Sequence, residues 1–181
     1  SSEDGVLFNK AKTKLIQYPV GKTDVEYTVP EGVTTIGDYS FFSCVNLNNI
    51  KMPRELKTIE KGVFKECTAL DNVEIPKGAT YIGGQAFHGC GGLNQIVISE
   101  TVTNIDMDAF NGCDNLTIYG IANSYAEKYA NENCINFSAL EEFIVENGVL
   151  IEYNGSGGDI VIPGNMGITS IGKYVFCNNQ S

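Results

Sequence analysis

The chain has 181 residues, a formal net charge of −10 and a hydrophobic content of 43%. This length suits one folded domain or one elongated repeat array, and the apolar content is sufficient for a buried core. The acidic balance, with no stripe of Lys and Arg, excludes nucleic acid as a partner because a phosphate backbone would be repelled. Apolar runs extend over only a few residues, whereas a membrane-spanning helix needs about 20. The sequence therefore predicts no transmembrane segment.

Residues 1–32 precede the regular part of the chain. They include Asp4–Leu7 and Val25–Pro30, two short segments that have similar counterparts nearer the C-terminus. We interpret residues 1–32 as an N-terminal hairpin cap that feeds a repeat array.

Residues 33–122 contain four copies of a 23-residue repeat. Four columns of apolar residues recur at this spacing without an insertion: Ile36, Ile59, Ile82 and Ile105; Phe41, Phe64, Phe87 and Phe110; Cys44, Cys67, Cys90 and Cys113; Leu47, Leu70, Leu93 and Leu116. A unit of this size cannot bury its own apolar face, so successive units must stack and share a continuous core.

Each copy also predicts one short β-strand. Segments Leu47–Met52, Leu70–Ile75 and Leu93–Ile98 have apolar residues at alternate positions after the Leu, which places alternate side chains in the core. The predicted fold class is mainly β with few short helices: a leucine-rich-repeat solenoid of 23-residue coils. One short strand per coil is expected to form a continuous sheet, and a hairpin and a helix are expected to cap it.

The repeat resembles the BspA-like leucine-rich-repeat family. Residues Ile82-Gly83-Gly84-Gln85-Ala86-Phe87-His88-Gly89-Cys90-Gly91-Gly92-Leu93 match the family pattern Ile-Gly-x-x-Ala-Phe-x-x-Cys-x-x-Leu. The resemblance covers about residues 28–122 and recurs near the C-terminus. It implies a bacterial surface or secreted protein associated with adhesion.

The pattern changes in the fourth copy and after it. The strand that begins at Leu116 is one residue short between its apolar positions, so its register is expected to shift. Ser124 followed by Glu127 is a capping-box signature, and Tyr125 and Tyr129 fall on one helical face. Residues 123–140 are therefore predicted to be a capping helix and connector.

Residues 141–181 are predicted to form a second hairpin and the start of a further repeat block. Asn147–Leu150 is similar to Asp4–Leu7, and Asp159–Pro163 is similar to Val25–Pro30, with a glycine-rich turn at Asn154–Gly158. Ile171 and Phe176 restart two of the columns. Leu47 lies eleven residues after Ile36, so the Leu after Ile171 would be residue 182. We therefore expect this chain to be a fragment of a longer array.

No cluster of residues predicts a catalytic centre, a metal site or a cofactor. Four cysteines form one column instead of a CxxC pair, so we interpret them as small buried thiols, while Cys134 and Cys177 could pair or stay free. His88, the single histidine, is expected in an exposed loop. Asp106 and Asp108 are expected to face solvent or to hold a cation weakly, since no loop supplies the oxygens of a calcium site.

The outward side chains of the predicted strands form the candidate binding surface. The first column is Asn49, Asn72 and Gln95, and the second is Lys51, Glu74 and Val97. Stacked amides could simply hydrogen-bond along the first column. The second column changes its chemistry from coil to coil, as expected where no structural rule fixes it, and repeat proteins commonly bind through such a face.

Two functions from different classes follow. The first is a non-catalytic binding or adhesion module of a secreted or cell-surface bacterial protein, acting as a monomer on an extracellular protein or glycan. The second is a spacer that presents another domain of a longer protein. An enzyme is the third hypothesis, since repeats can be appended to hydrolases.

Overall fold

The computed structural model describes residues 2–140, 143–153, 168–173 and 175–176. The elements in chain order are β1 (Ser2–Glu3), β2 (Val6–Phe8), β3 (Lys14–Gln17), β4 (Glu26–Thr28), β5 (Thr35–Ile36), β6 (Asn49–Lys51), β7 (Thr58–Ile59), β8 (Asn72–Ile75), β9 (Tyr81–Ile82), β10 (Gln95–Ile98), β11 (Asn104–Ile105), β12 (Thr117–Ile121), α1 (Tyr125–Glu132), β13 (Asn136–Leu140), β14 (Phe143–Glu146), β15 (Val149–Tyr153) and β16 (Ser170–Ile171).

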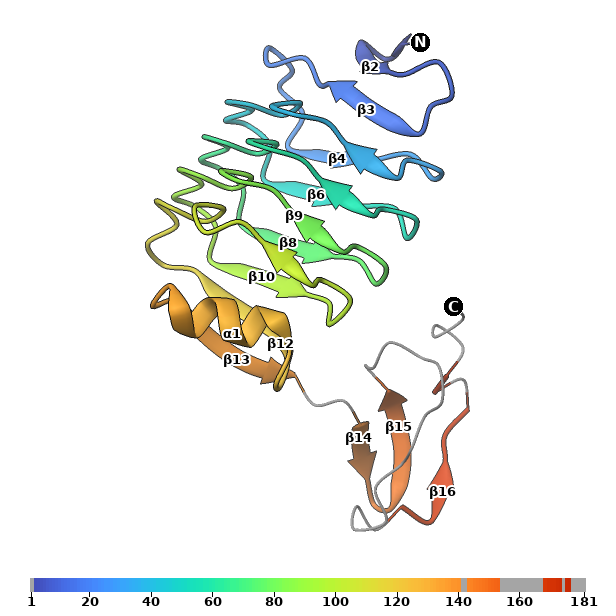
Figure 1. Ribbon diagram of the computed structural model, residues 1–181. Helices are drawn as coiled ribbons and strands as arrows, with labels where there is room; N and C mark the ends of the chain where they lie inside the picture. The colour runs from blue at the N-terminus through green and yellow to red at the C-terminus, as the bar shows by residue number, and fades with distance from the viewer. Residues whose placement is uncertain (1, 141–142, 154–167, 174, 177–181) are drawn as a thin grey trace.

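The repeats form a solenoid whose coils stack along one axis (Figure 1). The strands predicted from the sequence lie in a six-stranded sheet, ordered β13-β12-β10-β8-β6-β4. The structure adds a second, two-residue strand to each coil, and these join the N-terminal strands in a seven-stranded sheet, ordered β1-β2-β3-β5-β7-β9-β11. The sequence did not predict this sheet, because a two-residue strand is too short to show alternation.

Stacked aromatic rings fill the centre of the coils. Phe41, Phe64, Phe87 and Phe110 form the middle of the stack, with ring centroids 5.2, 5.1 and 5.1 Å apart. Tyrosines occupy both ends: Tyr18 stacks on Phe41 at 5.0 Å, and Tyr129 meets Phe110 edge-on at 5.9 Å. At the ends of the stack a phenol can reach polar groups, and the Tyr18 hydroxyl donates to Asp24 while the Tyr129 hydroxyl donates to the Met107 carbonyl.

The cysteine column is a set of buried free thiols, as predicted. Cys67, Cys90 and Cys113 each donate from Sγ to the carbonyl of the Phe 26 residues earlier, at 3.0, 3.0 and 3.1 Å. The column therefore suits Cys because a small apolar side chain with one weak donor both fits the space and satisfies a backbone acceptor of the preceding coil. Cys134 is free and exposed, and Cys177 lies outside the described residues.

One turn requires a glycine. Tyr39 and Gly62 occupy equivalent positions in adjacent coils, and both have left-handed backbone conformations, with φ of 53° and 62°. The Tyr39 ring lies where a Cβ on Gly62 would be, since that Cβ would overlap carbons of the ring. Gly62 therefore both relieves the backbone strain and makes room for the aromatic ring of the coil before it.

The register shift after Leu116 is present. Gln95 pairs with Thr117 and Val97 with Tyr119, a step of 22 residues where the earlier strands step by 23. Helix α1 follows, and its Ser124 Oγ accepts from the Glu127 amide at 3.5 Å, while Glu127 Oε2 accepts from the Asn123 amide at 2.6 Å. The helix does not end the six-stranded sheet, because β13 returns to pair with β12.

The C-terminal strands repeat the arrangement at the start of the array. Strands β14 and β15 are antiparallel and β15 pairs parallel with β16, as β2, β3 and β5 do. The Gly172 amide donates to the Leu150 carbonyl at 2.7 Å, as Gly37 donates to Leu15 at 2.9 Å. Asn154–Gly158 and Asp159–Pro163, which the sequence placed in this block, lie outside the described residues.

This block has its own small core. Tyr153 contacts Phe176 with ring centroids 5.4 Å apart, in the positions that Tyr18 and Phe41 take in the first array. Leu150 is completely buried, and Phe143, Tyr153 and Val175 pack around it. The C-terminal block therefore resembles the start of the first array in its sequence, its backbone hydrogen bonds and its aromatic pair.

Candidate functional site

The outer face of the six-stranded sheet carries two columns of side chains. The neutral column is defined by Asn49, Asn72, Gln95, Thr117 and Asn136, which are paired in register across β6, β8, β10, β12 and β13. On β4 the exposed Glu26 pairs with Asn49, so the line of side chains becomes charged at that edge of the sheet. The mixed column is defined by Thr28, Lys51, Glu74, Val97, Tyr119 and Ser138, two residues further along each strand. The residues between them, such as Ile50, Val73, Ile96 and Ile118, are buried.

The six residues predicted from the sequence all lie on this outer face. The structure adds Thr117 and Tyr119 of β12, which the 23-residue spacing missed because of the one-residue deletion. It also adds residues of β4 and β13, whose segments lack the Leu that marks a strand in the central repeats. The one-residue shortening after Leu116 could have revealed the β12 residues. The repeat spacing places residue 120 in the column of Val97, and moving back by one residue gives Tyr119.

The neutral column is not held together by a chain of amides. Asn72 Nδ2 donates to Asp71 Oδ2 at 2.9 Å, and Asn94 Nδ2 donates to Asp71 Oδ1 at 2.8 Å. Asp71 therefore links two coils beside the sheet and fixes the orientation of the Asn72 amide. Nδ2 keeps its second hydrogen and Oδ1 accepts no hydrogen bond within the described part of the chain, so the Asn72 amide can still both donate to and accept from a partner outside the strand.

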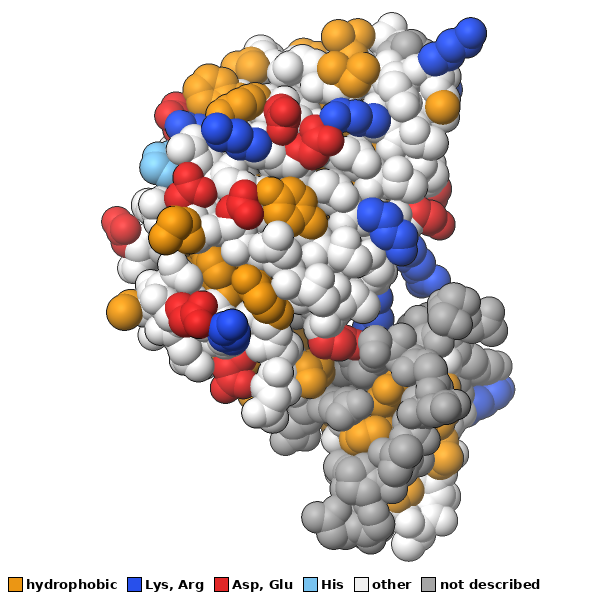
Figure 2. All heavy atoms as spheres, viewed as in Figure 1, with side chains coloured by type: hydrophobic (Ala, Val, Ile, Leu, Met, Phe, Trp, Pro, Cys, Tyr) orange, Lys and Arg blue, Asp and Glu red, His pale blue; other side chains and the backbone are white. Residues whose placement is uncertain are grey.

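The face borders an open hollow of about 1650 Å³. All six predicted residues line it, together with Ile151, Glu152 and Tyr153 of β15. Arg54, Lys57 and Lys77 form its rim, and Figure 2 shows Lys and Arg side chains along that edge of the array. The hollow therefore extends over β6, β8 and β10 of the sheet as well as β15.

The candidate polar residues elsewhere serve internal contacts. Tyr81 donates its hydroxyl to Asp106 Oδ2 at 2.8 Å, and the Gln85 amide donates to Asp108 Oδ1 at 3.2 Å. The hydrogen bond to Asp106, followed by burial, raises the pKa of Tyr81. Both carboxylates are half-buried, so they face solvent only in part and are also held by the preceding coil.

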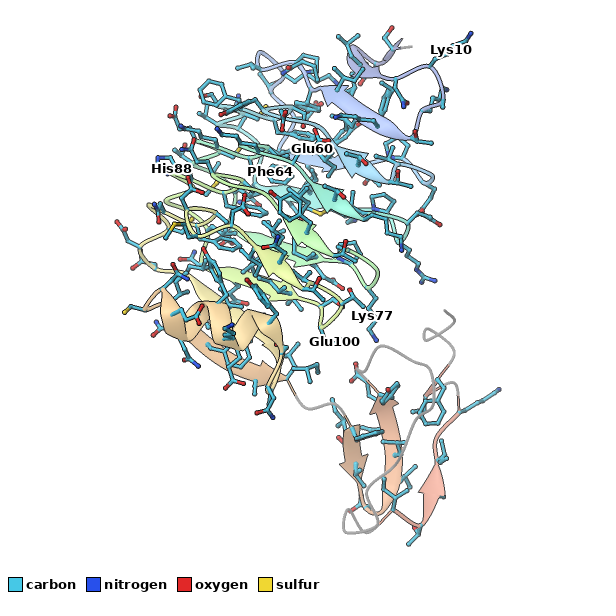
Figure 3. All side chains as sticks on the ribbon, viewed as in Figure 1. Lys10, Glu60, Phe64, Lys77, His88 and Glu100 are labelled. Carbon is cyan, nitrogen blue, oxygen red and sulfur yellow. The ribbon has the colours of Figure 1, made fainter. Side chains whose placement is uncertain are left out.

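His88 is half-buried instead of exposed, and its Nδ1 is buried without a hydrogen-bond partner in the described structure. It lies on the edge of the coils opposite Lys77 and Glu100 (Figure 3). The prediction of an exposed loop overlooked the stacking of neighbouring coils, which shields side chains even in turns.

Within the described ranges, no three or more His, Cys, Asp or Glu side chains come together as a metal site. Helix α1, the one helix in the part of the chain that is described, is too short and polar to cross a membrane. The site is thus a surface of side-chain donors, acceptors and a few apolar groups.

Stacked coils with one Leu-marked strand each define the class of protein as a leucine-rich-repeat solenoid. The model of the BspA type leucine rich repeat region matches residues 24–151 in six copies. The chain belongs to this family, which confirms the resemblance read from its Ile, Phe, Cys and Leu columns. No curated protein matches the sequence.

Solved structures of similar proteins are bacterial. A leucine-rich repeat protein from Eubacterium ventriosum is 28% identical with a TM-score of 0.63, covering 94% of this chain and 47% of that one. A leucine rich cell surface protein from Faecalibacterium prausnitzii is 30% identical with a TM-score of 0.51, covering 76% and 42%. The T. pallidum leucine rich repeat protein is 30% identical with a TM-score of 0.51, covering 52% and 45%. The chain thus spans less than half the length of each.

Proposed function

We propose that this chain is a non-catalytic binding module of a secreted or cell-surface bacterial protein, recognising a protein or glycan through the outer face of its six-stranded sheet. The observation that carries the proposal is the contrast between the two sides of one strand. Inward positions repeat from coil to coil, whereas the mixed column changes from Lys51 to Glu74, Val97 and Tyr119. A side chain that the fold does not specify is available for recognition.

The position of this face supports the proposal. Lys51 and Glu74 are exposed, and Val97 and Tyr119 are half-buried, so the column offers both charge and apolar area. The description of the F. prausnitzii relative as a cell surface protein supports the location. Recognition would use many modest contacts around a few anchors, and Tyr119 is the best candidate anchor because Tyr is enriched among residues that dominate binding energy.

The first experiment is binding of the chain to a panel of extracellular matrix proteins and glycans. The test variant combines Asn72→Arg with Glu74→Arg, which adds bulk and positive charge at the centre of the face. The control combines Asn111→Arg with Asp114→Arg, two exposed loop positions away from the sheet with the same total charge change. We expect the test variant to lose binding and the control to keep it, with both retaining the melting temperature of the parent chain.

Equal binding by both variants would place recognition elsewhere on the molecule. Absence of saturable binding to every component of the panel would argue against the binding module as a whole.

A spacer is the second candidate function, and the C-terminal block favours it. Strands β14, β15 and β16 repeat the starting arrangement of the first array, as a modular stalk built from successive arrays would. A spacer predicts that arrays can be removed or duplicated in the full-length protein without loss of binding by its other domains. Loss of binding on removing this array alone would reject the spacer.

A further inference from the structure

We infer that the ligand of the strand face is a linear, neutral glycan lying along the solenoid axis, with one sugar unit over each coil. The inference rests on the proposed function, since it names the ligand class for the same face. Three observations carry it. The neutral column supplies uncharged hydrogen-bonding side chains, Val97 and Tyr119 form an apolar pair beside it, and the sheet sets a regular spacing between coils.

The spacing is the first argument. Adjacent strands of a sheet lie about 4.8 Å apart, and the neutral column places one side chain on each of five successive strands. One unit of an extended polysaccharide advances by a similar length. A glycan along the axis therefore stays in step with the column, so the same contact can be made at every coil.

A peptide does not fit this face as well. An extended peptide rises about 3.3 Å per residue, and it therefore falls out of step with the columns when it runs along the axis. The usual way to bind an extended peptide is to pair its backbone with a free strand edge. Strands β6, β8, β10 and β12 are each paired on both sides, so their face offers side chains and no free backbone groups.

The chemistry of the neutral column is the second argument. Amides and hydroxyls each both donate and accept hydrogen bonds, which matches the hydroxyl groups of a sugar. Asn49 and Thr117 are half-buried and Asn72, Gln95 and Asn136 exposed, so all can reach a ligand. Asp71 already holds the Asn72 amide at 2.9 Å, and a side chain fixed in advance loses less entropy on binding.

An apolar pair lies beside the neutral column. Val97 and Tyr119 are paired neighbours in the mixed column, next to Gln95 and Thr117 of the neutral column. An aromatic ring beside hydrogen-bonding groups can receive the apolar face of a sugar while its hydroxyls bond to the neighbouring column. Lys51 and Glu74, further along the mixed column, carry opposite charges, so the column itself does not select an anion.

The test is calorimetric titration of the chain with cello-, xylo-, manno- and N-acetylated chito-oligosaccharides of two to eight units, all of them neutral. For at least one series we expect affinity to rise about three- to tenfold with each added unit, one net hydrogen-bonded contact at a time, and to level off near the five positions of the neutral column. The gain should be insensitive to salt, because the contacts are neutral.

Variants locate the contacts. Asn72→Ala and Tyr119→Ala should each weaken binding at least threefold, whereas Tyr119→Phe should keep most of the affinity if the ring provides an apolar platform. Thr58→Ala, at a half-buried outward position in the other sheet of the same array, should leave affinity unchanged. Circular dichroism melting of each variant separates lost contacts from lost folding.

Affinity that is independent of oligomer length would overturn the inference. Affinity that falls steeply with salt would also overturn it, because recognition would then lie on the basic side chains of Arg54, Lys57 and Lys77. Binding of a matrix protein through this face, with no oligosaccharide bound, would also overturn it while leaving the proposed function intact. Failure of both kinds of ligand would count against both.

Discussion

Replacing Phe87 with Ala is predicted to be among the most damaging substitutions in the array. Phe87 is completely buried and stacks between Phe64 and Phe110, with ring centroids 5.1 Å away on each side. Truncating a buried Phe costs about 3–5 kcal/mol through lost burial and the cavity left behind. Two aromatic contacts are lost at once, so we expect about 4–5 kcal/mol, in the upper part of this range. The central position also weakens the coupling of the coils on either side.

Phe42→Ala is the matched control, because it makes the same chemical change next to the stack on a side chain that is 38% exposed. Its ring contacts only Tyr39 edge-on among the described aromatic pairs, at 6.3 Å, so we expect a cost below about 1 kcal/mol. The chain contains no Trp, and urea unfolding followed by circular dichroism is the suitable assay. Equal unfolding free energies for the two variants at unchanged m-value would refute the inside–outside assignment.

Three further substitutions probe the polar and backbone details of the coils. Ser40→Ala should raise the unfolding free energy by up to about 1 kcal/mol, since its buried Oγ has no partner in the described structure and an unsatisfied hydroxyl is costly; destabilisation would mean that a partner exists. Gly62→Ala should lower the unfolding free energy by about 1–3 kcal/mol, because the φ of residue 62 is 62° and an added Cβ would meet the Tyr39 ring. An unchanged melting temperature would contradict this expectation. Burial raises the pKa of Cys67 from 9.0 to about 12. The thiol ionises more readily in the unfolded chain, so its contribution to stability is complete below pH 9 and is lost as the pH rises towards 12. Urea unfolding between pH 8 and 11 should show a smaller decline in Cys67→Ala, and identical slopes would reject the assignment.

Two features of the fold follow directly from the sequence: the columns of core residues and the capped helix. The Ile, Phe, Cys and Leu columns each become a line of buried side chains, because identical residues at a fixed spacing must stack when no single coil can bury them. The capping-box pair Ser124 and Glu127 located helix α1 because that interaction is confined to one turn. The six candidate face residues also emerged from alternation within single strands.

Tertiary structure alone decided how these local pieces meet. The two-residue strands of the seven-stranded sheet exist only because neighbouring coils supply their pairing partners. They are too short to show an alternation of apolar and polar residues in the sequence. The sequence also gave no sign that Asp71 would join Asn72 and Asn94 beside the candidate face, or that the hydroxyl of Tyr81 would take up Asp106 from the next coil. The Asp71–Asn94 and Tyr81–Asp106 contacts link residues about one repeat apart, and they depend on how the coils turn and stack. Periodicity thus determined the core and the strands of the central repeats, whereas the orientation of polar side chains on the surface was fixed by packing between coils.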